Sequence, residues 1–114
     1  MKIENIKAQM RKGVLELCVL GILINETMYP SDIIKKLKDN QLIVVEGTMY
    51  PLLNRLKRDG YLSHTWVESP SGPPRKYYKI TEKGKQFRNN LAKAWDELSH
   101  AVNISNHQKK PLNE

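Results

Sequence analysis

Residues 44–84 contain the feature that most limits how this chain can fold: an amphipathic helix that leads into a basic, aromatic hairpin. Four apolar side chains fall at i, i+3, i+4 and i+7, which places them on one face of an α-helix: Met49, Leu52, Leu53 and Leu56. Gly60 follows at the position where a left-handed residue commonly ends a helix. Such a helix rests its apolar face on a core and presents a polar, cationic face to the outside.

The hairpin is predicted at residues 62–80, as two strands around the turn segment SPSGPP at residues 69–74. Its return strand carries Arg75, Lys76 and Lys79. Side chains alternate between the two faces of a strand, so one of the two tyrosines at 77 and 78 must point inward. We expect Tyr78, with Ile80, to enter the core. The pattern predicts an α+β, mainly helical fold: a winged helix-turn-helix with a two-stranded wing.

The segment before this unit supplies the rest of the core. Ile3, Ile6 and Met10 recur at helical spacing and form an amphipathic arm. Residues 14–24 are apolar on nearly every side and predict a buried central helix. Ser31 is expected to cap the next helix. Residues 42–45 are apolar and short, so they form either a small strand or a buried link. The following helix begins either with Thr48 as its N-cap or near Glu46.

A long C-terminal helix is expected over residues 81–106, with Thr81 as its N-cap. Its apolar stripe has nearly the heptad period, so this helix needs a partner along its length; the stripe is Phe87, Leu91, Trp95, Leu98 and Val102. We therefore divide the chain into a winged helix-turn-helix domain with its arm (1–80), a dimerisation helix (81–106) and a flexible tail (107–114).

Charge and cysteine content favour a polyanionic partner and a reducing compartment. The chain of 114 residues has a net charge of +7, and residues 30–84 alone contribute +4 of it. Lysine and arginine contacts with phosphates release bound counterions, which favours binding of a basic protein to nucleic acid. Cys18 is the single cysteine, expected to be a buried thiol in the cytoplasm. We expect no signal peptide and no membrane-spanning segment, because the apolar run at 14–24 is too short.

Two motifs at this separation resemble the PadR family of bacterial transcriptional regulators. The first is EGTMYPLLNRL at residues 46–56, and the second is SGPPRKYYKITEKG at residues 71–84; RKGVLEL at 11–17 extends the similarity. The short chain after Gly84 is similar to the small subgroup with one C-terminal helix. The resemblance implies a homodimeric winged helix-turn-helix repressor or regulator. It also implies a recognition helix at 47–59, a wing at 62–80 and a dimer interface built from the two terminal helices.

The candidate DNA contacts divide by position. Residues at the start of the recognition helix are expected to reach base edges: Thr48 and Tyr50 first, then Asn54. Arg55, Lys57 and Arg58 lie later and are expected to meet phosphates, which position a protein without specifying sequence. Arg75 and Lys76 of the wing are expected at the backbone or in a minor groove. The predicted dimer interface comprises Ile3, Ile6, Met10, Phe87, Leu91, Trp95, Leu98 and Val102.

Other kinds of site have weaker support. In multidrug-binding PadR proteins a tryptophan on the last helix stacks on planar ligands. The resemblance implies the same role for Trp95, although packing across a dimer accounts for Trp95 equally well. Trp66 is assigned to packing within the hairpin. The histidines lack metal-ligand spacing, and no catalytic motif is present, so we expect no metal, no cofactor and no enzyme activity.

Three functions remain open on this reading. The first is a dimeric repressor that binds double-stranded DNA at an inverted-repeat operator. The second is a winged-helix module that binds acidic protein partners. The third is a sensor that holds an unknown small-molecule effector at the dimer interface.

Overall fold

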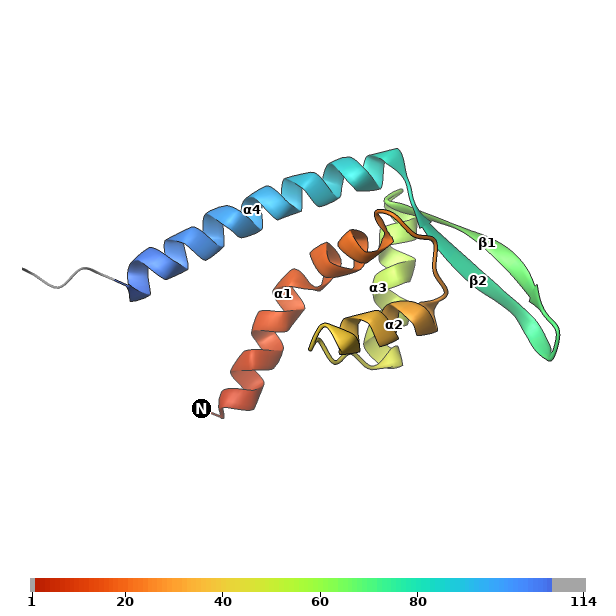
Figure 1. Ribbon diagram of the computed structural model, residues 1–114, viewed down its shortest axis with the longest axis horizontal. Coiled ribbons are helices and arrows are strands. Elements are labelled where there is room, and N and C mark those ends of the chain that lie inside the picture. The colour runs from red at the N-terminus through yellow and green to blue at the C-terminus, as the bar shows by residue number, and fades with distance from the viewer. Residues whose placement is uncertain (1, 108–114) are drawn as a thin grey trace, which may run out of the picture.

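The computed structural model describes residues 2–107 as four helices and one antiparallel hairpin (Figure 1). The order is α1 (Ile3–Leu23), α2 (Pro30–Asp39), α3 (Glu46–Arg58), β1 (Leu62–Ser69), β2 (Gly72–Ile80) and α4 (Glu82–Asn106). Helices α1, α2 and α3 pack together, the hairpin extends away from them, and α4 leaves the end of β2 alongside α1. This arrangement confirms the predicted fold class. The predicted tail lies outside the described residues except for His107.

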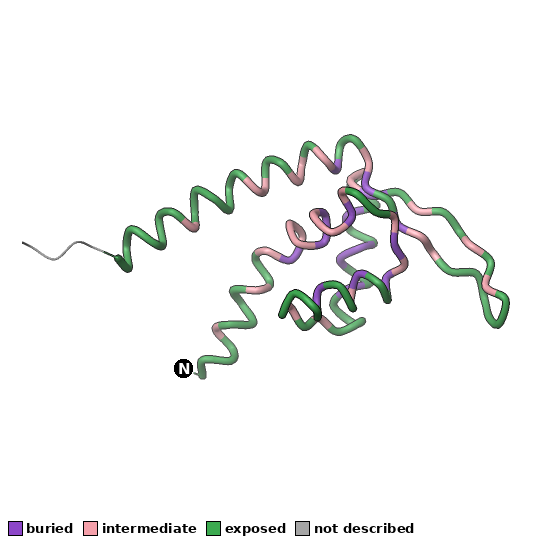
Figure 2. The backbone as a smooth tube through the Cα atoms, viewed as in Figure 1, coloured by how far each residue is buried: buried purple, intermediate pink, exposed green. Residues whose placement is uncertain are grey.

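Helix α1 joins the predicted arm and the predicted central helix into one continuous element. Leu15, Val19, Leu20 and Leu23 are buried, and every other residue from 14 to 24 is at least half-buried. The arm carries no buried residue, and Ile3 and Met10 are exposed (Figure 2). The second half of α1 therefore belongs to the core of the domain, and the first half, where Ile6 is half-buried, has little cover from its own chain.

Helix α2 begins two positions earlier than predicted. Its N-cap is Tyr29 and Pro30 is its first residue, so the prediction of Ser31 as N-cap is wrong. Proline suits this first position because its missing N–H has no helical partner there in any case. The backbone N–H of Tyr29 donates to the Asp32 carboxylate at 3.4 Å. The Ser31 hydroxyl therefore does not cap the helix and is available to a partner from another element.

The link between α2 and α3 is not a strand. Leu42 and Val44 are half-buried, whereas Ile43 and Val45 are exposed, so the link is buried on one side only. A different segment pairs with the free edge of β2. The backbone of Met28 exchanges two hydrogen bonds with that of Tyr78, at 3.0 and 2.8 Å. This bridge joins the segment before α2 to the second half of β2.

Helix α3 starts at Glu46, the earlier of the two predicted starts, with Val45 as its N-cap. Its four predicted apolar residues are all buried. Pro51 lies inside the helix at its sixth position, and its missing N–H removes the helical hydrogen bond to the Gly47 carbonyl. Gly60 ends the helix with a φ of 85°, as the sequence predicted.

The hairpin has one face on the core. Leu62, His64 and Trp66 of β1 lie opposite Ile80, Tyr78 and Lys76 of β2. Tyr78 is 1% exposed and Ile80 4% exposed, which confirms both as core residues. Burial raises the pKa of the Tyr78 phenol, and the nearby Tyr50 adds to the effect, so Tyr78 is neutral at pH 7.

Four elements meet at a corner made by residues 59–61 and 80–84. The Thr81 hydroxyl donates to the Gly60 carbonyl at 2.7 Å and accepts from the Gly84 N–H at 3.0 Å, which confirms Thr81 as the N-cap of α4. The Thr81 N–H donates to the Tyr61 carbonyl at 3.1 Å. The Tyr61 ring stacks on Phe87 with centroids 4.0 Å apart.

Beyond this corner α4 has little cover. Phe87 and Leu91 are half-buried against the core, but Trp95, Leu98 and Val102 are 44%, 58% and 50% exposed. Figure 2 shows the far half of α4 as largely exposed. No helix among residues 2–107 is long and apolar enough to cross a membrane.

Gly84 should tolerate no side chain. A β-carbon there would overlap the Tyr61 carbonyl oxygen and lie 2.8 Å from Cγ1 of Ile80. We expect Gly84→Ala to lower the free energy of unfolding by roughly 2–3 kcal/mol or more, the range for overpacked sites. This should lower Tm by about 10 °C or more in a thermal melt.

Gly21→Ala is the matched control, because nothing lies within 4 Å of a β-carbon at that helical position. It should keep or raise stability, by up to about 1 kcal/mol. Equal melting temperatures for the two variants would contradict the close approach at the corner.

Candidate nucleic-acid interface

A groove lies between the exposed side of α3 and the wing. Its volume is about 310 Å³, and α2, α3 and the hairpin all contribute to its lining: Pro30, Ser31, Tyr50, Asn54, Trp66, Pro74, Arg75, Lys76 and Tyr78. Four of these residues are predicted DNA contacts: Tyr50 and Asn54 of α3, and Arg75 and Lys76 of β2. The fold thus brings together two pairs that lie at least 20 residues apart in sequence. The lining includes two cations and no carboxylate.

Tyr50 and Asn54 reach the groove because they lie one turn apart on α3. The apolar side chains behind them are buried, which fixes the rotation of the helix about its axis. Both side chains are exposed, so their hydroxyl and amide groups are available to a ligand. These are the groups that pair with base edges in a major groove.

Arg75 ties the wing to the start of α2. Its Nη2 donates to the Ser31 hydroxyl at 2.8 Å, and its guanidinium carbon lies 4.0 Å from the centre of the Tyr29 ring. Tyr29 in turn packs on Tyr77 with centroids 4.7 Å apart. The sequence predicted a DNA contact for Arg75 and missed this clamp. The free Ser31 hydroxyl at the true helix start is what makes the clamp possible.

Lys57 and Lys76 make the inner side of the wing electropositive. Burial lowers the pKa of His64, and the charges of Lys57 and Lys76 lower it further. His64 is therefore neutral at pH 7, and the positive charge of this region comes from lysine and arginine. Arg58, near the end of α3, is exposed and lies 3.3 Å from the Asp59 carboxylate.

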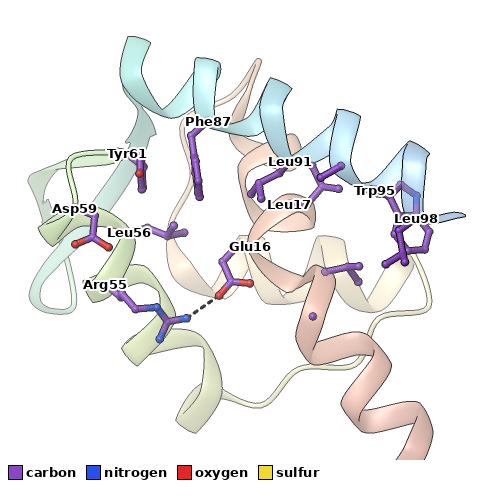
Figure 3. Close-up of a pocket in the computed structure, with 13 residues that line it drawn as sticks. Glu16, Leu17, Arg55, Leu56, Asp59, Tyr61, Phe87, Leu91, Trp95 and Leu98 are labelled. Atoms are coloured by element: carbon purple, nitrogen blue, oxygen red, sulfur yellow. Dashed lines mark hydrogen bonds and ion pairs between the residues drawn. The ribbon is translucent and has the colours of Figure 1, made fainter.

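Thr48 and Arg55 lie on the opposite flank of α3 from the groove. Nη2 of Arg55 donates to the Glu16 carboxylate of α1 at 2.7 Å (Figure 3). Thr48 is exposed beside Arg11 and Lys12 of α1. Thr48 was predicted to reach base edges and Arg55 to meet phosphate, but their positions on the helix turn them towards α1. Glu16 could not be predicted as the partner of Arg55, because the two residues are 39 positions apart in sequence.

A second hollow, also of about 310 Å³, lies between α1, the end of α3 and α4. Figure 3 shows Phe87, Leu91, Trp95 and Leu98 of α4 along one side of this hollow, with Leu17 of α1 beside Leu91 and the Glu16–Arg55 ion pair at the rim. Asp59 adds a second carboxylate to the lining. The structure thus places Trp95 on an apolar wall that is open to solvent.

Other chemistry finds no support in the described residues. Among residues 2–107, no three His, Cys, Asp or Glu side chains lie close enough together to hold a metal ion. Cys18 is half-buried, and burial raises the pKa of its thiol, which disfavours the reactive thiolate.

The fold and the groove define a winged helix-turn-helix protein. A model of the transcriptional regulator PadR-like family matches residues 19–90, and the chain belongs to this family. The family prediction is therefore confirmed. The family and its solved relatives are transcriptional regulators and not enzymes, which also confirms the prediction that this protein is not an enzyme.

Several solved structures are similar over most of the chain. A PadR-like transcription factor from Bacteroides fragilis is 60% identical, covers 87% of this chain and 96% of its own, and has a TM-score of 0.74. A PadR family regulator from Eggerthella lenta is 29% identical, covers 94% of each chain and has a TM-score of 0.87. A PadR-like regulator from Bacillus cereus is 37% identical over 89% of this chain and 99% of its own, with a TM-score of 0.76.

Proposed function

We propose that this protein is a homodimeric transcriptional regulator that binds double-stranded DNA through α3 and the wing. The observation that carries the proposal is the groove in which Tyr50 and Asn54 of α3 meet Lys76 of the wing with no carboxylate among the lining residues. An amphipathic helix of this size fits a major groove, and a basic hairpin beside it reaches the flanking backbone. Family membership supports the regulatory role.

The proposed contacts have two functions. Tyr50 and Asn54, which both line the groove, read base edges. Lys57, Arg58 and Lys76 neutralise phosphates. Arg75 contributes first by holding the wing against α2. We leave Arg55 out of the set because Glu16 holds its guanidinium at 2.7 Å; Arg58 stays in it because its ion pair with Asp59 is longer, at 3.3 Å, and its side chain is more exposed.

Substitutions in the two groups should have different effects on binding. Lys76→Gln should weaken all duplexes alike and reduce the slope of log K against log salt by about one unit, because one phosphate contact is lost. Asn54→Ala should instead reduce discrimination among duplexes by roughly 1–3 kcal/mol. Binding curves over a salt series, on duplexes selected from a random pool, measure both effects.

Lys79→Gln is the control, because it removes the same charge from an exposed position on the other face of the hairpin. Its salt slope should match that of the unsubstituted protein. Failure of the unsubstituted protein to bind duplexes selectively would favour the alternative, a module that binds acidic proteins.

Dimerisation is proposed from apolar surface that the chain leaves uncovered. Ile3 and Met10 of α1 and Trp95, Leu98 and Val102 of α4 are all exposed, and Figure 1 shows an open angle between these two helices. Extended apolar surface on such a protein marks an interaction site. The amphipathic helix that can fill this angle and cover both helices at once is α4 of a second copy.

Leu98→Asp should therefore dissociate the dimer. It places an unpaired charge in a dry contact, at a cost of about 3–5 kcal/mol, so the dissociation constant should rise at least about 100-fold. Light scattering over a concentration series measures this. His100→Asp is the control, because residue 100 lies two positions on and faces the other side of the helix. A monomeric unsubstituted protein at micromolar concentration would exclude the proposed dimer.

A two-fold dimer calls for an operator with the same symmetry. Two identical α3 helices enter successive major grooves on one side of the duplex when half-site centres lie about 10 base pairs apart, or a multiple of this. We propose that the protein occupies such an inverted repeat in a promoter and acts as a repressor.

The spacing of the operator provides a test. Inserting about 5 base pairs between the half-sites should abolish tight binding, because it turns one half-site to the far side of the duplex. An insertion of about 10 base pairs is the control for added length. Footprinting should show symmetric protection on the original operator. Unchanged affinity on the shorter insertion would mean that each protomer binds independently.

The apolar hollow beside Trp95 favours a second role as a sensor of a small molecule. Its wall of aromatic and aliphatic side chains suits a planar ligand, and its rim carries the Glu16–Arg55 ion pair and Asp59. Trp66→Phe leaves Trp95 as the single tryptophan of the chain. Titration of this variant with the planar cation proflavine should then quench Trp95 emission to saturation. Emission that falls only in proportion to dye absorbance would exclude the pocket.

A further inference from the structure

The inner face of the hairpin continues beyond the part that α3 covers. Leu62, His64 and Trp66 share this face with their partners Ile80, Tyr78 and Lys76. Exposure rises sharply along it, from 2% at Leu62 to 62% at Trp66. The same face that closes the core near the corner therefore presents a large aromatic ring to solvent near the tip of the wing.

The indole of Trp66 is held in place without being buried. His64 contacts it edge-on, with ring centroids 5.8 Å apart and an interplanar angle of 85°. The Lys76 ammonium lies 5.4 Å from the indole centroid. Trp66 also lines the groove with Tyr50 and Asn54 of α3. The packing of the domain does not require this ring, since more than half of its surface is outside the core.

The chemistry around the ring indicates what would cover it. The groove is cationic and its lining includes no carboxylate, which favours a polyanion. An apolar ring beside an ammonium matches the alternation of a DNA strand, in which an uncharged sugar is followed by a charged phosphate. A second copy of the chain is a poor match, because the uncovered apolar stripe lies on α4 and not on the wing.

We propose that Trp66 packs against deoxyribose of the DNA strand beside the α3 contact while Lys76 pairs with the adjoining phosphate. This inference rests on the proposed DNA-binding function and adds a third kind of contact to it. The indole is uncharged, so it adds affinity without releasing counterions. Every nucleotide has the same sugar, so the contact adds affinity without sequence preference.

Trp66→Ala therefore has its own signature. Affinity for all duplexes should fall about tenfold, as expected when roughly 60 Å² of apolar contact is lost. The salt slope and the ranking of duplexes should stay as in the unsubstituted protein, unlike in Lys76→Gln and Asn54→Ala. Trp66→Phe should recover most of the lost affinity. Thermal melts should show little change, because the side chain is largely exposed.

Fluorescence reports the contact directly, because the chain has two tryptophans. Trp95→Phe leaves Trp66 as the single emitter, and Trp66→Phe leaves Trp95. A mixed-sequence duplex of about 30 base pairs, added at low salt where backbone contacts are strongest, should change Trp66 emission in the first variant. Trp95 emission in the second variant should not change.

The outcomes distinguish the sugar contact of Trp66 from the DNA-binding function itself. Duplex binding with unchanged Trp66 emission and a Trp66→Ala affinity within twofold would overturn the sugar contact and leave the DNA-binding function standing. A changed salt slope in Trp66→Ala would also overturn it, by showing that the ring acts through Lys76. No duplex binding by the unsubstituted protein at low salt would overturn the proposed function itself.

Discussion

The close contact between Gly84 and the Tyr61 carbonyl sets the geometry on which the rest of the molecule depends. At this corner α3 ends, β1 begins, β2 ends and α4 begins. Thr81 bonds to Gly60, Tyr61 and Gly84, and the Lys83 ammonium donates to the Asp59 carbonyl at 2.8 Å. Helix α3, the hairpin and α4 are therefore fixed relative to one another by hydrogen bonds to a few backbone groups.

Local patterns in the sequence were sufficient for the elements and their inward faces. The spacing of Met49, Leu52, Leu53 and Leu56 defines the buried side of α3 whatever it packs on. Gly60 and Thr81 mark helix ends through local backbone chemistry, and Tyr78 is distinguished from Tyr77 by alternation with Ile80. Each of these signals lies within a few residues of its effect, which is why the sequence alone carries it.

Contacts between distant segments could not be predicted in the same way. The Arg75–Ser31 bond spans 44 positions and the Arg55–Glu16 ion pair 39. Both arginines are cationic and lie on the elements expected to contact DNA. Their partners Glu16 and Ser31 become apparent only when α1 and α2 are packed against those elements. The Met28–Tyr78 bridge could not be predicted from the sequence either, because a pairing of single residues leaves no alternating pattern. The groove itself exists only once α2, α3 and the hairpin are assembled.

The distribution of the core along the chain has a consequence for synthesis. Every buried hydrophobic residue among the described ones lies between Leu15 and Ile80, and α4 contributes only Gly84 to the buried set. Because a chain emerges from the ribosome N-terminus first, the complete core emerges before the exposed stripe of α4 does. The domain can thus close around its own apolar residues while the surface most prone to unwanted association is still inside the ribosome. The order of segments along the chain therefore limits the time for which the apolar stripe of α4 is exposed beside an unfolded domain.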